Sequence, residues 1–158
     1  MNNKATNVLL GVILVLVALN LAMTTILIDR QSKAGGANER FDPEVARDWG
    51  NNVVDLYNRR DHEALYALFS PQARIKIGQQ QLADQLGKLH QLFGVVEDHA
   101  YVNSVKLGEK GGAQYFQLFF NARVSGKNSP ATLKLSLVET NDKFSLYGLS
   151  INASESLD

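Results

Sequence analysis

The stretch that decides the fold is Ala113–Val124, which reads AQYFQLFFNARV. Successive side chains of a strand point to opposite sides of a sheet, so this alternation predicts a strand with one buried face. The residues expected on the buried face are Phe116, Leu118, Phe120, Ala122 and Val124. The residues expected on the opposite face are Tyr115, Gln117, Phe119, Asn121 and Arg123. Such a strand needs neighbouring strands and a covering layer.

The flanking sequence predicts three more strands. We expect them over residues 95–107, around Leu133–Leu137 and over residues 144–151. Gly and Asn/Asp clusters indicate the turns between them, which we place at residues 109–112, 126–130 and 141–142. The apolar phase slips between Leu146 and Tyr147, beside Gly148, and this predicts a β-bulge. Consecutive hairpins of this kind predict a four-stranded antiparallel sheet.

Three helices are expected before the strands. The first begins at Asp42-Pro43-Glu44 and ends near Arg60, because Asp is a good cap and Pro suits the first helical position. A short second helix begins after Asp61 and ends at Ser70-Pro71. Residues 74–78 are expected to be extended, and the third helix runs over residues 79–92 and ends at Gly94.

Together these elements predict an α+β domain over residues 41–151, in which three helices pack on a curved four-stranded antiparallel sheet. We expect the concave side of the sheet to meet the helices and to leave a pocket between them. Residues 152–158 are expected to form a frayed tail.

Residues 8–28 form an unbroken apolar run without any charged residue. At about 1.5 Å per residue, a helix of this length covers the roughly 30 Å hydrocarbon core of a bilayer. We therefore expect a transmembrane anchor helix over 8–28, a short tail over 1–7 and a flexible tether over 29–40. A cleaved signal peptide is the alternative, but the run is long for one and lacks a good cleavage site. A buried core helix is disfavoured because the run is apolar on every face.

Two features of the sequence bear on the orientation of this anchor, and they point in opposite directions. Lys4 and the amino terminus lie on one side, whereas Arg30, Lys33 and Arg40 lie on the other, so the count of positive charges leans slightly against export. A short tail before a hydrophobic helix is, however, typical of a signal-anchor that exports the domain on its C-terminal side. We expect a single-pass protein of the bacterial inner (cytoplasmic) membrane with an extracytoplasmic C-terminal domain.

Composition excludes several classes of function. The chain has no cysteine, so disulfides, thiolate metal sites and cysteine nucleophiles are absent. Sixteen Lys and Arg balance sixteen Asp and Glu, without the concentrated basic patch that nucleic-acid binding requires. The three histidines share no metal-ligand spacing, and no phosphate loop or dinucleotide fingerprint occurs. We expect no metal, no cofactor and no nucleic-acid partner.

The segment from Leu56 to Gly94 carries a family resemblance. Its elements Tyr57–Asp61, Leu68-Phe69-Ser70, Gln81-Leu82 and Phe93-Gly94, followed by hairpins, resemble the nuclear-transport-factor-like superfamily. These cone-shaped, cystatin-like α+β domains include ketosteroid isomerase and scytalone dehydratase, and the chain is most similar to small uncharacterised bacterial members tethered to membranes. The resemblance implies dimers packed sheet to sheet and a small apolar ligand inside the cone. The superfamily also contains tethered periplasmic subunits of secretion machines.

Catalytic members of this superfamily use an aspartate or a histidine–aspartate pair inside the cone, which makes Asp98, His99 and His90 the catalytic candidates. Strict alternation would place Glu97 and His99 on one face and Asp98 on the other, so Asp98 and His99 do not form a dyad by themselves. His90 lies one position past a leucine stripe, which favours a boundary residue over a base. His62, in the first turn of the second helix, is expected to be exposed.

The polar stripe Tyr115, Gln117, Phe119, Asn121 and Arg123 is a candidate ligand or interface site. It could bind a polar ligand if this side lined the cone, but a surface or an interface is favoured. A phenylalanine flanked by polar residues on an exposed sheet face is typical of a dimer interface.

These observations favour a membrane-anchored, non-enzymatic domain of the bacterial envelope that binds a protein partner, a second copy or a small ligand. One alternative is a small-molecule acid–base enzyme of the isomerase or dehydratase type. Another is a structural subunit of a secretion or conjugation apparatus.

Overall fold

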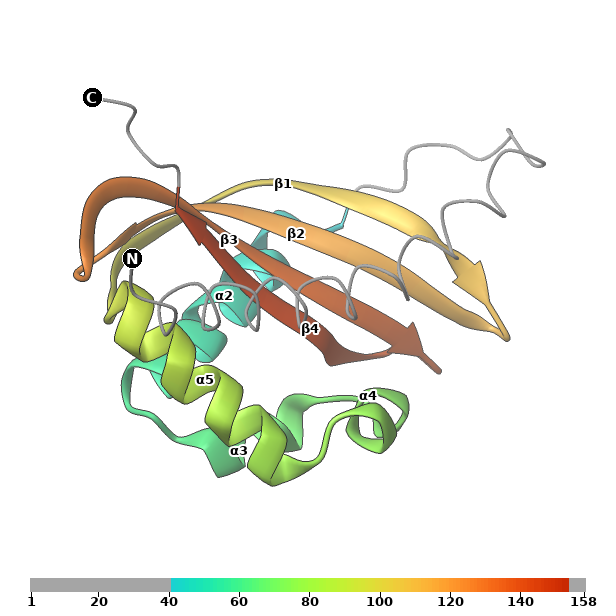
Figure 1. Ribbon diagram of the computed structural model, residues 1–158. Helices are drawn as coiled ribbons and strands as arrows, with labels where there is room; N and C mark the ends of the chain where they lie inside the picture. The colour runs from blue at the N-terminus through green and yellow to red at the C-terminus, as the bar shows by residue number, and fades with distance from the viewer. Residues whose placement is uncertain (1–40, 154–158) are drawn as a thin grey trace, which may run out of the picture. The chain divides into compact units, whose positions relative to one another are not determined.

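The computed structural model describes residues 41–153, apart from the side chains of residues 127–129 and 153, and within this range four helices precede four strands (Figure 1). The helices are α2 (Pro43–Asn58), α3 (His62–Leu68), α4 (Pro71–Lys76) and α5 (Gln79–Phe93). The strands are β1 (Val96–Lys110), β2 (Ala113–Val124), β3 (Lys127–Thr140) and β4 (Lys143–Ala153). The strands form one antiparallel sheet in the order β1-β2-β3-β4. The expected α+β class with a four-stranded antiparallel sheet is confirmed.

The helices begin where the capping residues predict. Asp42 accepts a hydrogen bond from the Glu44 N–H at 2.8 Å, and Asp61 accepts one from the Ala64 N–H at 3.0 Å. These bonds satisfy N–H groups that the first turn of a helix cannot pair internally. Gly94, with φ of 69°, ends α5 as expected.

The expectation of an extended piece over residues 74–78 was wrong for residues 74–76, because α4 extends over Pro71–Lys76, whereas Ile77 and Gly78 are extended as expected. Phe69 caps the end of α3, and Ser70 begins α4, since its hydroxyl accepts a hydrogen bond from the Ala73 N–H at 3.2 Å and proline occupies the first helical position. The Ser70 N–H also donates to the Leu146 carbonyl at 2.8 Å, which fixes this junction against β4. The described domain therefore has four helices rather than the three expected.

Most strand boundaries agree with the sequence, with small shifts. β1 continues to Lys110 and β3 begins at Lys127, so the first two connecting turns are tighter than expected. β4 extends to Ala153, so the predicted tail begins later. The turn between β3 and β4 is at Asn141 and Asp142, whose φ angles are 53° and 59°. Both residues tolerate this left-handed conformation, which matches the twist of a hairpin.

β-Bulges shape the two edge strands. The register of β1 against β2 shifts three times, and each shift leaves one extra residue on β1, at Glu97, Val102 and Leu107. Tyr147 is the extra residue in β4, which confirms the bulge predicted beside Gly148. A bulge sets two residues opposite one on the neighbouring strand and bends the bulged strand. The bulges also make an edge strand a poor template for pairing with another chain.

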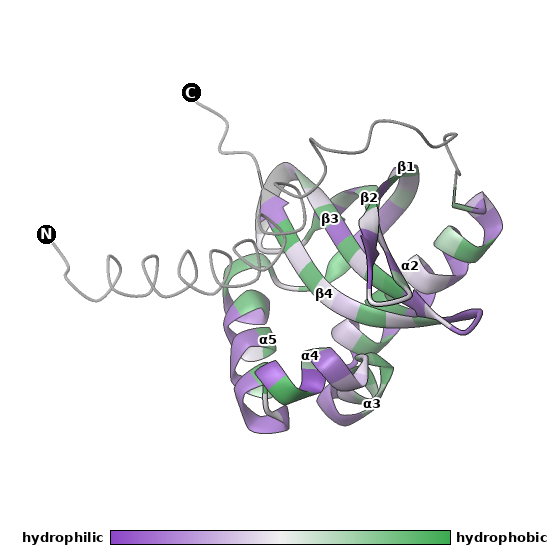
Figure 2. Cartoon of the chain, turned by 90° about the vertical axis from the view of Figure 1, so that its right-hand side faces the viewer, coloured by the Kyte–Doolittle hydropathy of each residue, from purple (hydrophilic) through white to green (hydrophobic). Residues whose placement is uncertain are grey.

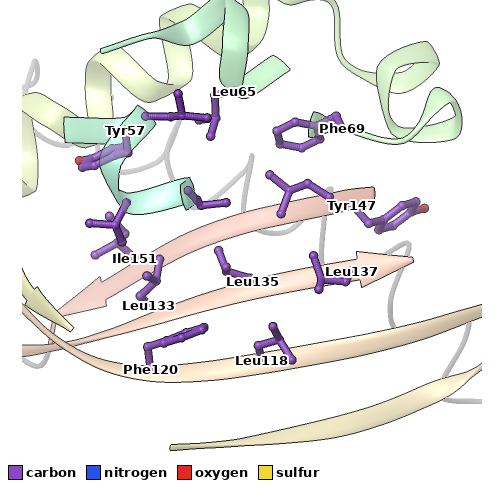
Figure 3. Close-up of a cluster of buried hydrophobic side chains, with 14 of the residues drawn as sticks. Tyr57, Leu65, Phe69, Leu118, Phe120, Leu133, Leu135, Leu137, Tyr147 and Ile151 are labelled. Carbon is purple, nitrogen blue, oxygen red and sulfur yellow. The ribbon is translucent and has the colours of Figure 1, made fainter. Parts of the chain in front are cut away.

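Helices α2–α5 cover one face of the sheet, which we call the inner face (Figure 1). Figure 2 shows hydrophobic and hydrophilic residues alternating along the strands, as the period of two predicts. In Figure 3, Tyr57, Leu65 and Phe69 from the helical layer lie against residues of the sheet. The sheet residues of this core that are at most 1% exposed include Leu118, Phe120, Leu133, Leu135, Leu137 and Leu146.

Trp49 of α2 is half-buried and packs against the core. α2 approaches the sheet closely at Gly50, where a Cβ atom would lie 2.5 Å from Cε1 of Phe120. A side chain at this position would therefore push α2 away from β2.

Three of the expected segments, the tail over 1–7, the anchor over 8–28 and the tether over 29–40, lie outside the described residues. Within residues 41–153, none of the helices has the length and apolar character needed to span a bilayer. Most of the tail expected over 152–158 also lies outside the described range, and Asn152 and Ala153 belong to β4.

Candidate functional site

The outer face of the sheet, which points away from α2–α5, carries the predicted polar stripe of β2. Phe119 lies in the middle of this stripe, half-buried, with Nζ of Lys134 on β3 at 5.6 Å from its ring centroid. On the other side, Val102 and Asn103 of β1 lie opposite Phe119 because of the bulge. Val102 is 52% exposed, and Val105, which pairs with Gln117 on the outer face, is 42% exposed. An apolar strip flanked by polar side chains therefore crosses β1 and β2.

Charges of both signs lie at the end of this strip. The Arg123 guanidinium is 3.4 Å from the Glu97 carboxylate, with both side chains about half exposed or more. An ion pair of this kind contributes at most about 1 kcal/mol. Asp98, which is exposed, lies opposite Arg123 in the register of β1 against β2. The outer face thus offers neighbouring positive and negative groups to anything that contacts it.

Tyr115 differs from the rest of the stripe because it packs at the other end of β2 against Tyr147. The two rings meet edge to face with centroids 5.3 Å apart, and Nζ of Lys76 in α4 donates to the Tyr147 hydroxyl at 2.9 Å. Burial raises the pKa of Tyr115, the neighbouring Tyr147 adds to the rise, and the charge of Lys76 opposes it. Tyr115 therefore belongs to a packed aromatic corner, whereas Asn121 and Arg123 are exposed.

His99 is on the inner face, opposite Ala122, at the edge of the contact between α2 and β1. Its Nε2 lies 3.0 Å from Oδ1 of Asn51, and this contact places the ring proton on Nε2. Desolvation lowers the pKa of His99, while the Asp98 charge opposes that shift. The imidazole is therefore predominantly neutral at pH 7.

The expected placement of Glu97 on the same face as His99 was wrong. The bulge at Glu97 sets Glu97 and Asp98 together opposite Arg123, and the ion pair with Arg123 fixes Glu97 on that side. Asp98 and His99 remain on opposite faces, so the structure does not assemble them into a dyad. Alternation alone could not have located the extra residue.

His90 is buried between the ends of α2 and α5. Its Nε2 lies 2.6 Å from the Tyr57 carbonyl oxygen, and its ring stacks on the Tyr57 ring with centroids 4.2 Å apart. The Tyr57 hydroxyl donates to the Gly94 carbonyl at 3.1 Å, and burial, only partly opposed by Arg60, raises the pKa of Tyr57 to about 12. These contacts join α2 to the end of α5, which gives His90 a structural position.

The expectation that His62 is exposed was wrong, because the residue is half-buried. Its Nε2 is buried without a hydrogen-bond partner among the described residues. Within residues 41–153, no group of three or more His, Asp or Glu side chains could hold a metal ion.

A cavity of about 290 Å³ opens at one end of the sheet, beneath the N-terminus of α2. Its walls come from the start of α2, the start of β2, the end of β3 and the start of β4, and are Phe41, Asp42, Val45, Gln114, Phe116, Glu139 and Phe144. The sequence predicted a pocket between helices and sheet but not these residues, since they come from segments up to about a hundred positions apart.

No protein-family model matches the chain, and a search of curated proteins finds no significant match. The function of the domain is therefore inferred from its own surfaces and cavity.

Proposed function

We propose that this chain is a membrane-anchored, non-enzymatic domain of the bacterial envelope that pairs with a second copy through the outer face of its sheet. In this proposal residues 8–28 span the inner membrane, residues 29–40 form the tether, and residues 41–151 form an extracytoplasmic, cone-shaped domain of the nuclear-transport-factor-like type. The observation that carries the proposal is the apolar strip of Val102, Val105 and Phe119 on the outer face.

The chemistry of this strip suits a protein contact. On a fully solvated sheet face, Val102 and Val105 add strand propensity but leave apolar surface in water beside the half-buried Phe119. An interface centre, by contrast, is typically apolar and aromatic with a polar rim. Asn103 and Asn121 supply rim residues that can donate and accept hydrogen bonds.

Charge and tethering favour a second copy as the partner. Glu97 and Asp98 lie close to Arg123 on the same surface, so two copies related by a twofold axis can set opposite charges against each other. The net formal charge of the chain is zero, which removes long-range repulsion between copies. Anchoring in one membrane would also raise the effective concentration of the two domains.

Single-cysteine crosslinking of the full-length chain in membranes tests this proposal, because the chain has no cysteine of its own. Asn103→Cys places the thiol at the rim of the strip, and Asn52→Cys places it on the exposed side of α2 as a matched control. We expect an oxidised dimer from Asn103→Cys and little from Asn52→Cys.

Adding Val105→Asp to the Asn103→Cys chain should reduce the dimer by roughly tenfold, because an unpaired charge would be buried at the interface. Ile75→Asp is the control, since Ile75 is 86% exposed on α4, away from this face. Equal crosslinking from Asn103→Cys and Asn52→Cys would show that the outer face does not pair with itself. If Asn103→Cys instead crosslinked to a different protein in cells, the partner of the outer face would be that envelope protein and not a second copy.

An acid–base enzyme is the second candidate function, and His99 is the residue that favours it. A neutral imidazole beside Phe120 could serve as a base, because burial tunes such groups toward proton transfer near neutral pH. NMR titration of the histidines in the full-length chain tests this alternative. An ordinary pKa for His99 would contradict it.

A further inference from the structure

The cavity beneath the N-terminus of α2 has three aromatic walls. Phe41 meets Phe116 edge to face with centroids 5.3 Å apart, and it meets Phe144 at 4.8 Å with a tilt of 59°. Phe116 and Phe144 are 6.1 Å apart and nearly perpendicular, at 72°. Since the rings are inclined to one another, they present both edges and faces around the cavity.

Ring faces carry negative charge density and attract cations. This end of the domain already contains one such contact, because Nζ of Lys106 lies 6.0 Å from the centroid of Phe116. The cluster therefore accommodates a cation next to an aromatic face. The cavity lining itself contains no Lys, Arg or His.

The polar part of the lining is acidic. Asp42 and Glu139 are its charged members, and Gln114, paired with Glu139 across β2 and β3, is the third polar group. One Asp42 oxygen, Oδ1, accepts the Glu44 N–H, and Asp42 is exposed on the solvent side. Two carboxylates beside three phenylalanine rings disfavour an anionic ligand and complement a positive one.

We propose that this cavity binds a small soluble organic cation, an ammonium compound with an apolar body. The apolar body contacts Val45 and the phenylalanine rings, and the ammonium group lies toward Asp42 and Glu139. The volume of about 290 Å³ is at the lower end of small-molecule sites, which are roughly 300–1,000 Å³, so the ligand is smaller than a typical drug. This site is separate from the outer face, so the result of a binding test at the cavity does not depend on dimer formation.

The test compares three probes of nearly equal size on the full-length chain in non-ionic detergent. They are 2-phenylethylammonium, neutral 2-phenylethanol and anionic phenylacetate. Ring-labelled phenylalanine signals in NMR report the site, since the chain has seven Phe residues and Phe41, Phe116 and Phe144 line the cavity.

We expect 2-phenylethylammonium to shift the three cavity phenylalanines with a Kd of about 1 mM or below. It should bind roughly fivefold more tightly than the alcohol and far more tightly than phenylacetate. Asp42→Asn combined with Glu139→Gln should abolish this preference, because both changes keep size and Asn still caps α2. Glu63→Gln, an exposed acid on α3, is the matched control and should change nothing.

Three results would overturn the proposal. One is equal affinity for the ammonium compound and the alcohol, which would make the cavity merely apolar. Another is a cation preference that survives the double substitution. The third is the absence of shifts at Phe41, Phe116 and Phe144 up to about 10 mM probe, a concentration at which even a weak site is occupied.

Discussion

Asn58, the last residue of α2, joins the helical layer to the first strand, and replacing its side chain should lower the free energy of unfolding. Its Nδ2 donates to the Val96 carbonyl at 2.8 Å, and its Oδ1 accepts the Val96 N–H at 2.9 Å. The side-chain amide thus pairs with one backbone residue as a neighbouring strand would. Val96 is 4% exposed, so water cannot easily replace the amide.

The size of the effect is set by these two bonds. Each intramolecular hydrogen bond contributes about 1 kcal/mol, and a buried group left unpaired costs about 1–3 kcal/mol. Replacing Asn by Ala recovers a few tenths of a kcal/mol in helix propensity. We therefore expect Asn58→Ala to lower the free energy of unfolding by about 2–3 kcal/mol, or the midpoint of thermal unfolding by roughly 10 °C.

Urea and thermal unfolding of the full-length chain, with amide exchange at Val96, measure this effect. Asn52→Ala is the matched control, because Asn52 is exposed on the same helix and its replacement should be neutral or slightly stabilising. Asn58→Asp keeps the acceptor but loses the donor, so it should fall between the two. If Asn58→Ala differed from Asn52→Ala by less than about 0.5 kcal/mol, the reasoning that Asn58 links α2 to β1 would be refuted.

Two further predictions concern the contact between α2 and the sheet. Burial lowers the pKa of His99 below its usual 6.5, so the unfolded chain binds a proton at this residue more readily than the folded chain does, and the contribution of His99 to stability is complete above pH 6.5 and declines as the pH falls through the lowered value. Urea unfolding of the parent chain and of His99→Gln between pH 5 and 8 measures this effect. An unchanged pH dependence in the variant would contradict it. Gly50→Ala should lower the free energy of unfolding by about 1–2 kcal/mol despite the better helix propensity of alanine, because the new methyl group would lie 2.5 Å from Phe120. The control is Gly87→Ala in α5, where a Cβ meets nothing within 4 Å, and this change should be stabilising. A stabilised Gly50→Ala variant would show that Phe120 gives way easily.

The sequence located most elements because their signals are local. Asp42-Pro43 and Asp61 begin helices through bonds to N–H groups within three residues, and Asn141-Asp142 forms a hairpin turn through its own backbone preferences. α4 was missed although Ser70-Pro71 is also a helix start. The same proline suits the end of the preceding helix, and the contact of Ser70 with Leu146 that fixes the junction is not visible in the local sequence.

The candidate sites were predicted less completely. The period of two placed the stripe of β2 on one face correctly. That Tyr115 is packed, whereas Asn121 and Arg123 are exposed, depends on Tyr147 and Lys76, which come from other elements. His90 and His99 could be named as candidates from their type. Helix packing decides what surrounds them: His90 contacts the Tyr57 carbonyl, and His99 contacts Asn51.

By itself, the sequence determined that this chain contains a four-stranded antiparallel sheet preceded by capped helices, because strand alternation, caps and turns depend on residues close together in the chain. Tertiary structure alone decided where β1 bulges, which face Glu97 occupies, and that Phe41, Phe116 and Phe144 enclose a cavity with Asp42 and Glu139. These features depend on register and packing between distant segments, where one extra residue in a strand moves a side chain to the other face of the sheet.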